Sequence, residues 1–481
     1  MDISTVPLRA GSLRGVIAGA AGVALGVAVG GCQSYERSAL DLGSHRAAFE
    51  GRLDDGEAIA AFAARLGAEG EPAPTRFDLS DGLSLAEGEV VALFFNADLR
   101  LARLEAGVAL ATAETAGLWA DPTFGFDGAE ILSPAGLFEY GLTIGLTLPV
   151  SGRLAVERDR AEALHETELR RVVDLEWTTR ARTRSAWSAW TVARERTRLL
   201  DDVVEQVERV GALTGRLEEA GELTRVEGRL LRAQLVELRA EVVEARLVEE
   251  RARVELLGLL GLAAGAGVEL VPSLASVVEI DVGDGVGRLI AANTTLAVRR
   301  AAYRAAEETL RLEIREQYPD IRIGTGYGSE EGDDRLLLGV SVPIPILNAN
   351  RGGIARARAR REVARAAAET TFEGLTRELA LAEATLDATR ARRRAFETEL
   401  VPMLDEQAGE VERLAELGEV DTLILLQTVT RGYDAKRRLL DLRLAEVNAL
   451  IERARLLGPD EAWAAAGVDV VDDQNGKGVR R

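Results

Sequence analysis

Residues 141–153 read GLTIGLTLPVSGR. Apolar residues alternate with small or polar ones as far as Pro149, and an arginine-rich stretch follows. Alternation with a period of two is typical of a β-strand that has one apolar and one polar face. Ala, Arg, Glu and Leu dominate the rest of the chain, which is the composition of long charged helices. The sequence therefore predicts a two-faced strand within a mainly helical protein.

The composition excludes several classes of function. The chain of 481 residues carries 79 acidic and 59 basic side chains, a formal net charge of -20. A chain this acidic repels phosphate backbones, so we expect no nucleic-acid partner. It contains two histidines and a single cysteine, Cys32, which excludes an intrachain disulfide and a cysteine-based zinc site. We expect no metal and no other cofactor.

The first 31 residues have the form of an export signal peptide. Arg9 and Arg14 precede an uncharged run of small and apolar residues that ends at Cys32. The sequence VGGC at 29–32 resembles the lipobox of bacterial lipoproteins, where a peptidase cleaves before a cysteine that is acylated, for example with palmitate. By the same resemblance, Gln33 after the cysteine favours the outer membrane. The alternatives are an uncleaved anchor, for which the run is short, or a signal with a coincidental cysteine.

The chain contains an internal repeat, because several landmarks recur at one constant offset. Each pair is separated by 197 residues: Asn96 and Asn293, Pro122 and Pro319, Gly221 and Gly418, Gly261 and Gly458. We divide the chain into a signal peptide (1–31), a lipidated N-terminal lead (32–82), a first repeat (83–261), a linker (262–282), a second repeat (283–458) and a polar C-terminal tail (459–481).

Both repeats have the same expected order of elements. A helix leads to a proline, two strands follow, and a very long helical stretch is then interrupted by Gly221-Glu222 or by Gly418-Glu419. At about 1.5 Å per residue, the stretch that starts at Gly152 would reach on the order of 100 Å before its break. Apolar residues recur along it every three or four positions, at Leu199, Val203, Val207 and Val210. Such helices need lateral partners, which predicts coiled-coil packing.

The predicted strands alternate strongly enough to assign two faces. One face carries Phe138, Tyr140, Leu142, Ile144, Leu146 and Leu148, then Ile321, Ile323, Thr325 and Tyr327, then Leu336, Leu338, Val340 and Val342. The residues between them are mostly small or polar. Roughly ten residues let a tilted strand cross a bilayer, and apolar-out, polar-in alternation is the transmembrane-barrel pattern. Four strands cannot close a barrel, and lipid does not tolerate open edges, so several chains must share one. The alternative is a small soluble sheet that caps the helices.

With these features, residues 82–458 resemble a TolC-like outer-membrane efflux protein. The resemblance is carried by the repeat and by four stretches: LSLAEGEVVALFFNADLRLAR (83–103), WADPTFGFDG (119–128), LGVSVPIPILNANRGGIARARA (338–359) and TELVPMLDEQAGEVERLAELGEV (398–420). It implies a homotrimer with a shared twelve-stranded β-barrel that continues into an α-helical coiled-coil tunnel. It also implies a passive duct that meets a periplasmic adaptor and an inner-membrane pump of the RND or ABC type. The expected location is the outer membrane, lipid-anchored and extending into the periplasm.

The resemblance places the tunnel tip at the breaks beginning with Gly221 and Gly418. Members with an acidic entrance ring carry an Asp about nine residues after the tip glycine, where this chain has Gln427. The other candidates for a pore constriction or an adaptor-docking surface are Asp421, Arg225 and Arg229. The same residues also fit ordinary polarity of a helix surface, and both interpretations remain open.

Two other functions compete with a channel. One is a structural periplasmic coiled-coil lipoprotein without a pore, against which the strand alternation argues. The other is a helical metalloenzyme, suggested by Glu162-x-x-His165, which resembles half of a di-iron site. Such a site needs a second motif, and His45, the other histidine, has none. No catalytic arrangement can be singled out, so we expect a protein that is not an enzyme.

Replacing the lipobox cysteine tests the predicted anchor. Cys32→Ser should abolish acylation and signal cleavage, because the peptidase and the acyl donor both act at this residue. A single acyl chain holds a protein only marginally at a membrane, and the strands should add their own anchorage, so membrane association should persist. Mass spectrometry of the mature protein measures the modification, and an unmodified Cys32 in the wild-type chain would contradict the prediction.

Overall fold

The computed structural model describes residues 35–68, 74, 76–130, 138–220, 224–275, 283–330, 333–416 and 422–459. The predicted lipidation residue Cys32 and the tip residues Gly221, Gly418 and Asp421 lie outside these ranges. The chain divides into two compact units, residues 1–51 and 52–481. In the first unit, helix α2 (Leu42–Glu50) begins after Asp41, whose side chain accepts hydrogen bonds from the next turn.

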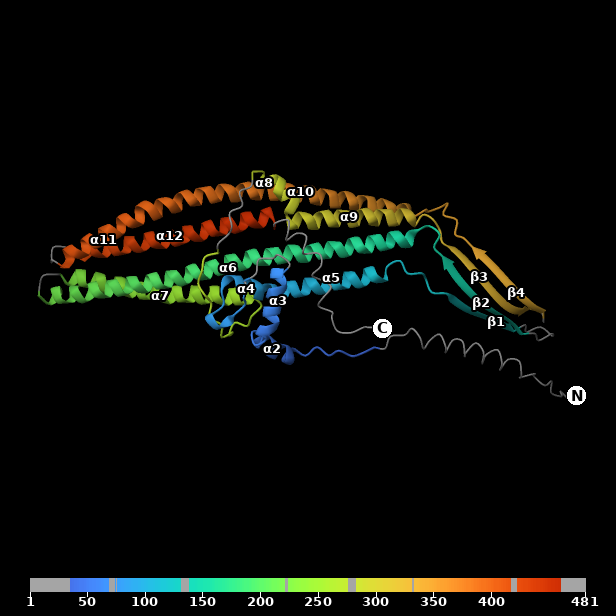
Figure 1. Ribbon diagram of the computed structural model, residues 1–481, viewed down its shortest axis with the longest axis horizontal. Helices are drawn as coiled ribbons and strands as arrows, with labels where there is room; N and C mark the ends of the chain where they lie inside the picture. Colours follow the sequence, from blue (N-terminus) through green and yellow to red (C-terminus); the bar gives the residue numbers. More distant parts are fainter. Residues whose placement is uncertain are drawn as a thin grey trace. The chain divides into compact units, whose positions relative to one another are not determined.

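The second unit is mainly helical, with a four-stranded antiparallel sheet, as the sequence predicted. Its first half contains α3 (Gly56–Ala68), the 3₁₀ turn η1 (Leu79–Asp81), α4 (Leu85–Phe95), α5 (Ala97–Thr115), β1 (Thr123–Glu130), β2 (Phe138–Leu148), α6 (Arg153–Ala220) and α7 (Arg225–Leu259). The second half contains α8 (Gly285–Ala292), α9 (Thr294–Arg315), β3 (Ile321–Glu330), β4 (Asp333–Ser341), α10 (Arg351–Ala395), the π-helical turn η2 (Phe396–Leu400), α11 (Val401–Glu416) and α12 (Thr422–Leu457). From α4 to α7 and from α8 to α12, the order of helices and strands is the same, except that α10, η2 and α11 take the place of the single helix α6 (Figure 1).

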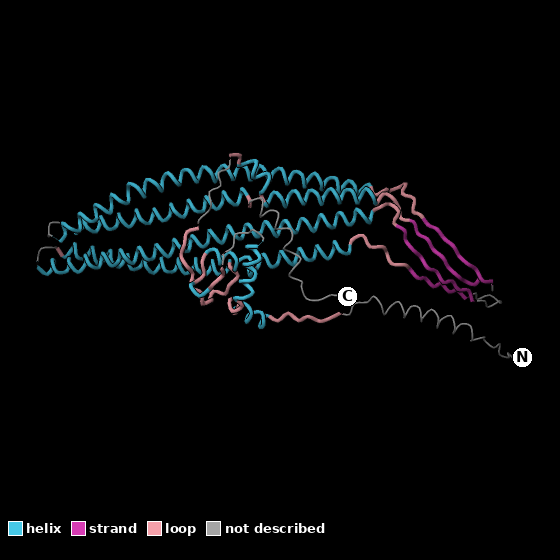
Figure 2. Tube along the Cα trace, in the orientation of Figure 1, coloured by secondary structure: helices cyan, strands magenta, loops and turns pink. Residues whose placement is uncertain are grey.

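The main helices and the sheet form one layer with a single lateral order. Next to the sheet, the packed neighbours run α5–α6–α9–α10. The strands that these helices join run β1–β2–β3–β4, so each helix continues into the strand at its own lateral position (Figure 2). In the half farther from the sheet the order is α7–α6–α12–α11. Helix α4 packs on one face of this layer, against α6.

Coiled-coil packing holds the half of the layer that lies farthest from the sheet. Helix α6 has 68 residues, which corresponds to roughly 100 Å. Its buried residues Leu200, Val203 and Val207 face Leu231 and Leu238 of α7, at spacings of three, four or seven. The predicted stripe is therefore present but starts at Leu200. The expected Leu199 and Val210 are only partly buried.

The long helix of the second half is not continuous, unlike α6. Between α10 and α11, the backbone N–H of Val401 donates to the carbonyl of Phe396, five residues back. Pro402 follows directly. Proline lacks an N–H and its ring clashes with the carbonyl four residues earlier, so a regular helix is disfavoured here. The π turn accommodates the proline, so α10 continues directly into α11 with a local change in hydrogen bonding.

Two equivalent asparagines join the helices at mid-length. Asn96 caps the start of α5, and its amide Nδ2 donates to the carbonyl of Leu259 at 2.9 Å. Asn293 caps the start of α9 and donates to the carbonyl of Leu456, also at 2.9 Å. This pair of sequence landmarks thus ties the start of one helix to the end of another.

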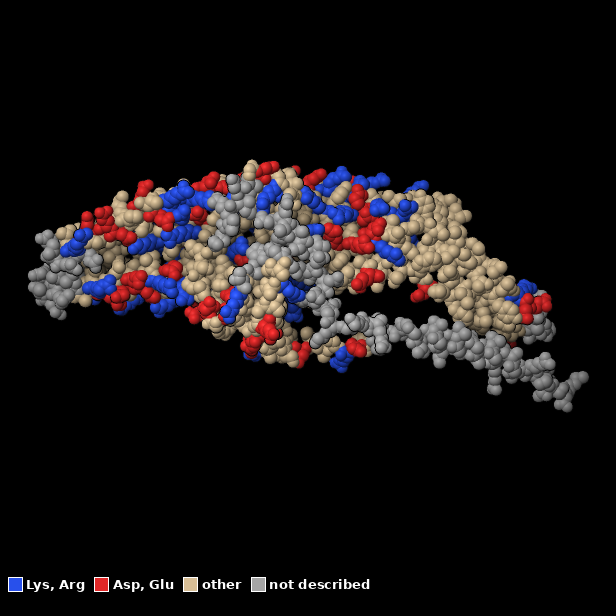
Figure 3. All heavy atoms as spheres, in the orientation of Figure 1, with Lys and Arg blue, Asp and Glu red and all other residues tan. Residues whose placement is uncertain are grey.

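Charged side chains are concentrated on the helices rather than on the sheet. On the face shown in Figure 3, acidic and basic side chains cover the helices, whereas the sheet is uncharged except at its far end. At that end of the sheet, β3 and β4 carry Glu330, Asp333, Asp334 and Arg335. None of the helices in the described residues combines the length and the apolar character that a membrane-spanning helix needs.

The glycine after α12 should be intolerant of a side chain. Gly458 has φ of 75°, and a Cβ there would clash with the carbonyl of Ala292. Gly458→Ala should destabilise the protein by about 1–3 kcal/mol from backbone strain alone. The control is Gly258→Ala inside α7, where a Cβ would meet nothing within 4 Å and helix propensity predicts a gain of up to about 1 kcal/mol. Thermal unfolding of the purified variants measures both, and equal melting temperatures would contradict the assigned junction.

Candidate functional site: the faces and edges of the sheet

The pairing register brings the apolar residues of all four strands onto one face. Residues paired directly across antiparallel strands project to the same side. Phe124, Ile144, Thr325 and Leu338 form one such row, and Phe126, Leu142, Tyr327 and Leu336 form the next. The assignment of residues to this face from the sequence is confirmed.

Small and polar residues occupy the opposite face. The row through Thr143 contains Gly125, Gly326 and Leu337. A second row joins Thr147, Arg322 and Ser341. Because many residues on this face are glycine, serine or threonine, its side chains occupy less volume than those on the apolar face.

The apolar face is not covered by the rest of the described chain. Leu338 is 79% exposed and Ile144 55% exposed. The described helices lie beyond one end of the strands and cover neither face (Figure 1). This arrangement argues against a small soluble sheet, which would need helices packed on its apolar side. An apolar surface of this extent requires contact with lipid or with another apolar surface.

The apolar band is bounded at both ends of the strands. At the helix end, exposed aromatic and aliphatic side chains occur where the chain enters or leaves the sheet, at Trp119, Val150, Tyr318 and Ile344. At the far end lie the charged residues around the β3–β4 connection, where Arg335 pairs with Glu330. The exposed apolar band is thus limited by charges at one end, and aromatic residues of the kind found at membrane interfaces occur at the other.

The sheet has two open edges. No described strand pairs with the outer side of β1 or of β4. The helices at the same two edges differ in their exposed residues: α5 presents the bulky Leu101, Leu104 and Val108. The exposed residues of α10 include several arginines, such as Arg356, Arg358 and Arg360, with alanines between them. The two edges therefore differ in side-chain chemistry, one being aliphatic and the other basic.

Part of the predicted tip can be located. Arg225 and Arg229 lie in the first turns of α7 and are exposed, and Gln427 is exposed near the start of α12. The α6–α7 and α11–α12 helix pairs both end at the side of the layer opposite the sheet (Figure 1). These three residues therefore lie at the end of the layer that is farthest from the sheet. A role for them in constriction or docking stays a prediction.

An ion-pair network joins the region of the π turn to α12, and no local sequence pattern predicted it. Glu446 of α12 accepts from Arg390 at 3.2 Å and also pairs with Arg393. Arg443 donates to Glu397 at 2.6 Å, and this hydrogen bond is the main reason that the pKa of Glu397 is lowered. The network fastens the irregular turn of one helix to the regular neighbour beside it.

A second group of charged pairs, also absent from the sequence prediction, lies between α4, α5 and α6. The buried carboxylate of Glu89 pairs with Arg180 at 3.3 Å and with Arg184. Arg103 pairs with Glu176 at 2.6 Å. In the sequence, the only local sign of these pairs is Glu89, a charged residue in the mainly apolar run 83–95. The partners could not be predicted, because the two residues of each pair are more than 70 positions apart in the sequence.

The Glu162-x-x-His165 motif is not part of a metal-binding cluster in the described residues. Glu162 is exposed and His165 partly buried, both on α6. Within the described ranges, no group of three or more His, Cys, Asp or Glu side chains is arranged to hold a metal ion.

The lateral order, the two-faced sheet and the open edges define the fold of a TolC-like outer-membrane channel. Among solved structures, CusC superimposes with a TM-score of 0.67 and 16% sequence identity, covering 78% of this chain and 92% of CusC. The outer-membrane channel OprN gives 0.68 and 18%, covering 80% and 94%. The CmeC outer-membrane channel of Campylobacter jejuni gives 0.66 and 14%, covering 79% and 86%. The resemblance drawn from the sequence is thus confirmed at the level of the fold. No protein-family model and no curated protein matches the sequence.

A charge on the apolar face should do more damage than the same charge on the opposite face. Near the middle of a bilayer, Ile144→Arg should cost about 2–4 kcal/mol. Thr143→Arg, one residue away, should be milder, because it projects to the other side between Gly125 and Gly326. Insertion into liposomes, followed by protease protection of the strands, measures the difference. Equal loss from both variants would reverse the assignment of the faces.

Proposed function

We propose that the protein is an outer-membrane channel, the passive exit duct of a tripartite efflux or secretion system. The observation that carries the proposal is the shared lateral order of sheet and helices, open at the same two edges from end to end. A layer of this kind is a segment of a tube wall, and its apolar band has the form of a bilayer-spanning surface.

Closure of the tube requires further copies of the chain. The edge formed by β1, α5 and α7 differs from the edge formed by β4, α10 and α11, so identical copies would join head to tail. A head-to-tail contact gives a ring when the rotation closes. Three copies of four strands make the twelve-stranded barrel expected from the TolC-like resemblance, and the helices continue it as an α-helical tunnel. The equivalent Asn96 and Asn293 junctions support an origin of each chain from two repeats of one unit.

The two faces of the layer can be assigned within this proposal. Helices α3 and α4 would obstruct the passage if they lay inside it. The face that carries them is therefore the outside of the tunnel, and the uncovered face of α6 lines the lumen. The apolar side of the sheet faces lipid, and the side with Gly125 and Thr143 faces the barrel interior.

The distal end is the proposed periplasmic entrance. Arg225, Arg229 and Gln427 lie at this end, and Asp421 and the glycines 221 and 418 belong to the same two turns by sequence. An adaptor protein would dock there and connect the duct to an inner-membrane pump of the RND or ABC type, which supplies the energy. Acylated Cys32 would add a lipid anchor in the outer membrane.

Planar-bilayer recordings test the proposal directly. The purified protein should run as a heat-resistant trimer in detergent and should produce single-channel conductance. Gln427→Asp should then raise cation preference, because carboxylates grouped around an axis attract cations; reversal potentials in a salt gradient measure this. A stable trimer without conductance would favour the structural coiled-coil lipoprotein instead. Conductance with unchanged selectivity would place the constriction elsewhere.

A further inference from the structure

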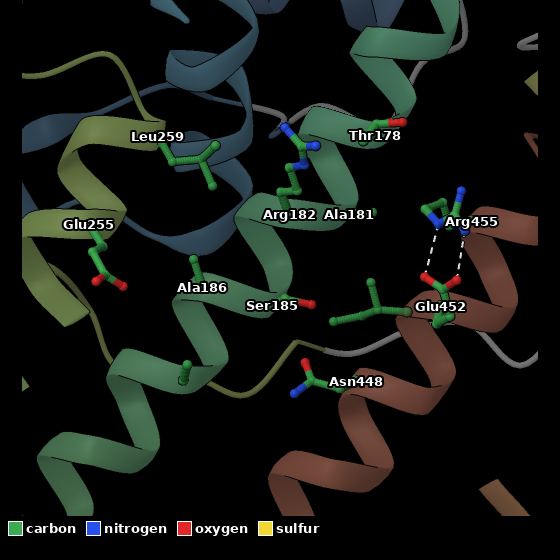
Figure 4. A pocket seen from close by; sticks show the side chains of 12 residues that line it. Thr178, Ala181, Arg182, Ser185, Ala186, Glu255, Leu259, Asn448, Glu452 and Arg455 are labelled. Carbon is green, nitrogen blue, oxygen red and sulfur yellow. Dashed lines mark hydrogen bonds and ion pairs between the residues drawn. The ribbon is translucent and has the colours of Figure 1, made fainter. Parts of the chain in front are cut away.

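A groove of about 740 Å³ lies on the helical layer at mid-length, between α6, α7 and α12. Its floor is formed by alanines of α6, including Ala181 and Ala189, with Ile451 and Leu259 at its sides. Polar side chains from all three helices project into or around it (Figure 4). Its volume falls within the range of about 300–1,000 Å³ that is usual for small-molecule sites, which also combine an apolar body with a few polar groups.

The polar groups of the groove have few partners within the protein. Among the described residues, Arg182 of α6 and Glu255 of α7 form no ion pair or hydrogen bond, although both line the groove. The Oδ1 atom of Asn448 is buried without a hydrogen-bond partner. Glu452 and Arg455 pair with each other at 2.6 Å, so they largely neutralise one another. One positive group on α6 and one negative group on α7 therefore remain available at the groove.

The hydroxyl groups of the groove differ from three of the other threonines on α6. Thr167, Thr183 and Thr197 each donate to the carbonyl four residues earlier. In the described part of the chain, Thr178 and Ser185 make no such bond. Donors that are not committed to the helix backbone are free to bind a ligand.

The groove is on the face of α6 that α4 does not cover. Trp187 is fully buried in the core that α4 forms with α6 and α7. Ser185 is two residues away, and a separation of two residues places side chains on nearly opposite sides of a helix. In the channel proposed above, the groove is therefore a recess in the tunnel wall.

We propose that this groove binds amphiphilic zwitterions, with the anionic group at Arg182, the cationic group at Glu255 and the apolar body on the alanine floor. Ser185 and Thr178 supply hydrogen bonds to the polar part. Its position in a substrate path rests on the proposed function, but binding itself does not require conduction. Passage through a duct needs sites that release what they bind, so the affinity should be weak and saturable.

Three fluorescent probes with one apolar body distinguish the charges. Nε-Dansyl-lysine is a zwitterion, dansylglycine an anion and dansylcadaverine a cation. Each is titrated into the full-length protein in nanodiscs, with empty nanodiscs subtracted. Arg182→Gln and Glu255→Gln should each weaken dansyl-lysine binding about fivefold, the loss expected for one charge pair in a half-exposed site. For dansylglycine, Arg182→Gln should weaken binding and Glu255→Gln should strengthen it, and dansylcadaverine should show the reverse.

Matched controls separate the groove from general surface charge. Arg209→Gln and Glu205→Gln remove an exposed ion pair farther along α6 and should change no affinity. Equal effects of these controls, or non-saturable binding to all variants, would overturn the proposal. Specific binding in a protein that gives no conductance would contradict the channel alone. Conductance with no variant-dependent binding would contradict the groove alone.

Discussion

An unpaired strand edge is the constraint on which this structure depends. β1 and β4 each leave a row of N–H and C=O groups without a partner among the described strands. In water such a row invites aggregation, and in lipid each unsatisfied group costs several kcal/mol. The apolar face beside it favours lipid, so in the proposed channel the edges are paired by other copies of the chain. The helices follow the same lateral order as the strands, and any pairing that closes the sheet also brings α5 of one copy beside α10 of the next.

The helical part gains its stability in a different way from the sheet. Long helices with many surface charges bury narrow apolar stripes, as Val203 and Val207 do against α7. Exposed ion pairs along them contribute little individually, with a median of about 0–1 kcal/mol each. Packing at mid-length is denser, where Trp187 and its neighbours are buried beneath α4. The layer is thus held most firmly near its middle, and its distal half relies on coiled-coil contacts.

Local patterns allowed much of the fold to be predicted. A period of two identified the faces around Ile144, because strand pairing preserves the alternation that each strand carries in its sequence. The constant offset between Asn96 and Asn293 located two similar junctions. The lateral order of elements could not be predicted, since it depends on contacts between segments far apart in the chain. The groove is missed for the same reason: Ser185 and Asn448 both line it, yet neither has a distinctive local sequence around it. The tip candidates came from family resemblance, and geometry adds only the location of Arg225, Arg229 and Gln427.

The two halves of the chain share their junctions but differ in stiffness. Helix α6 runs without interruption for 68 residues, and α4 packs directly on it. The corresponding helix of the second half contains the π turn before Pro402, where the regular hydrogen-bond ladder is broken. Arg393, Glu397 and Arg443 brace this turn against α12. The backbone of α10–α11 should therefore bend more easily than that of α6. Such a bend would either break the ion pairs between the turn and α12 or move α12 together with the turn.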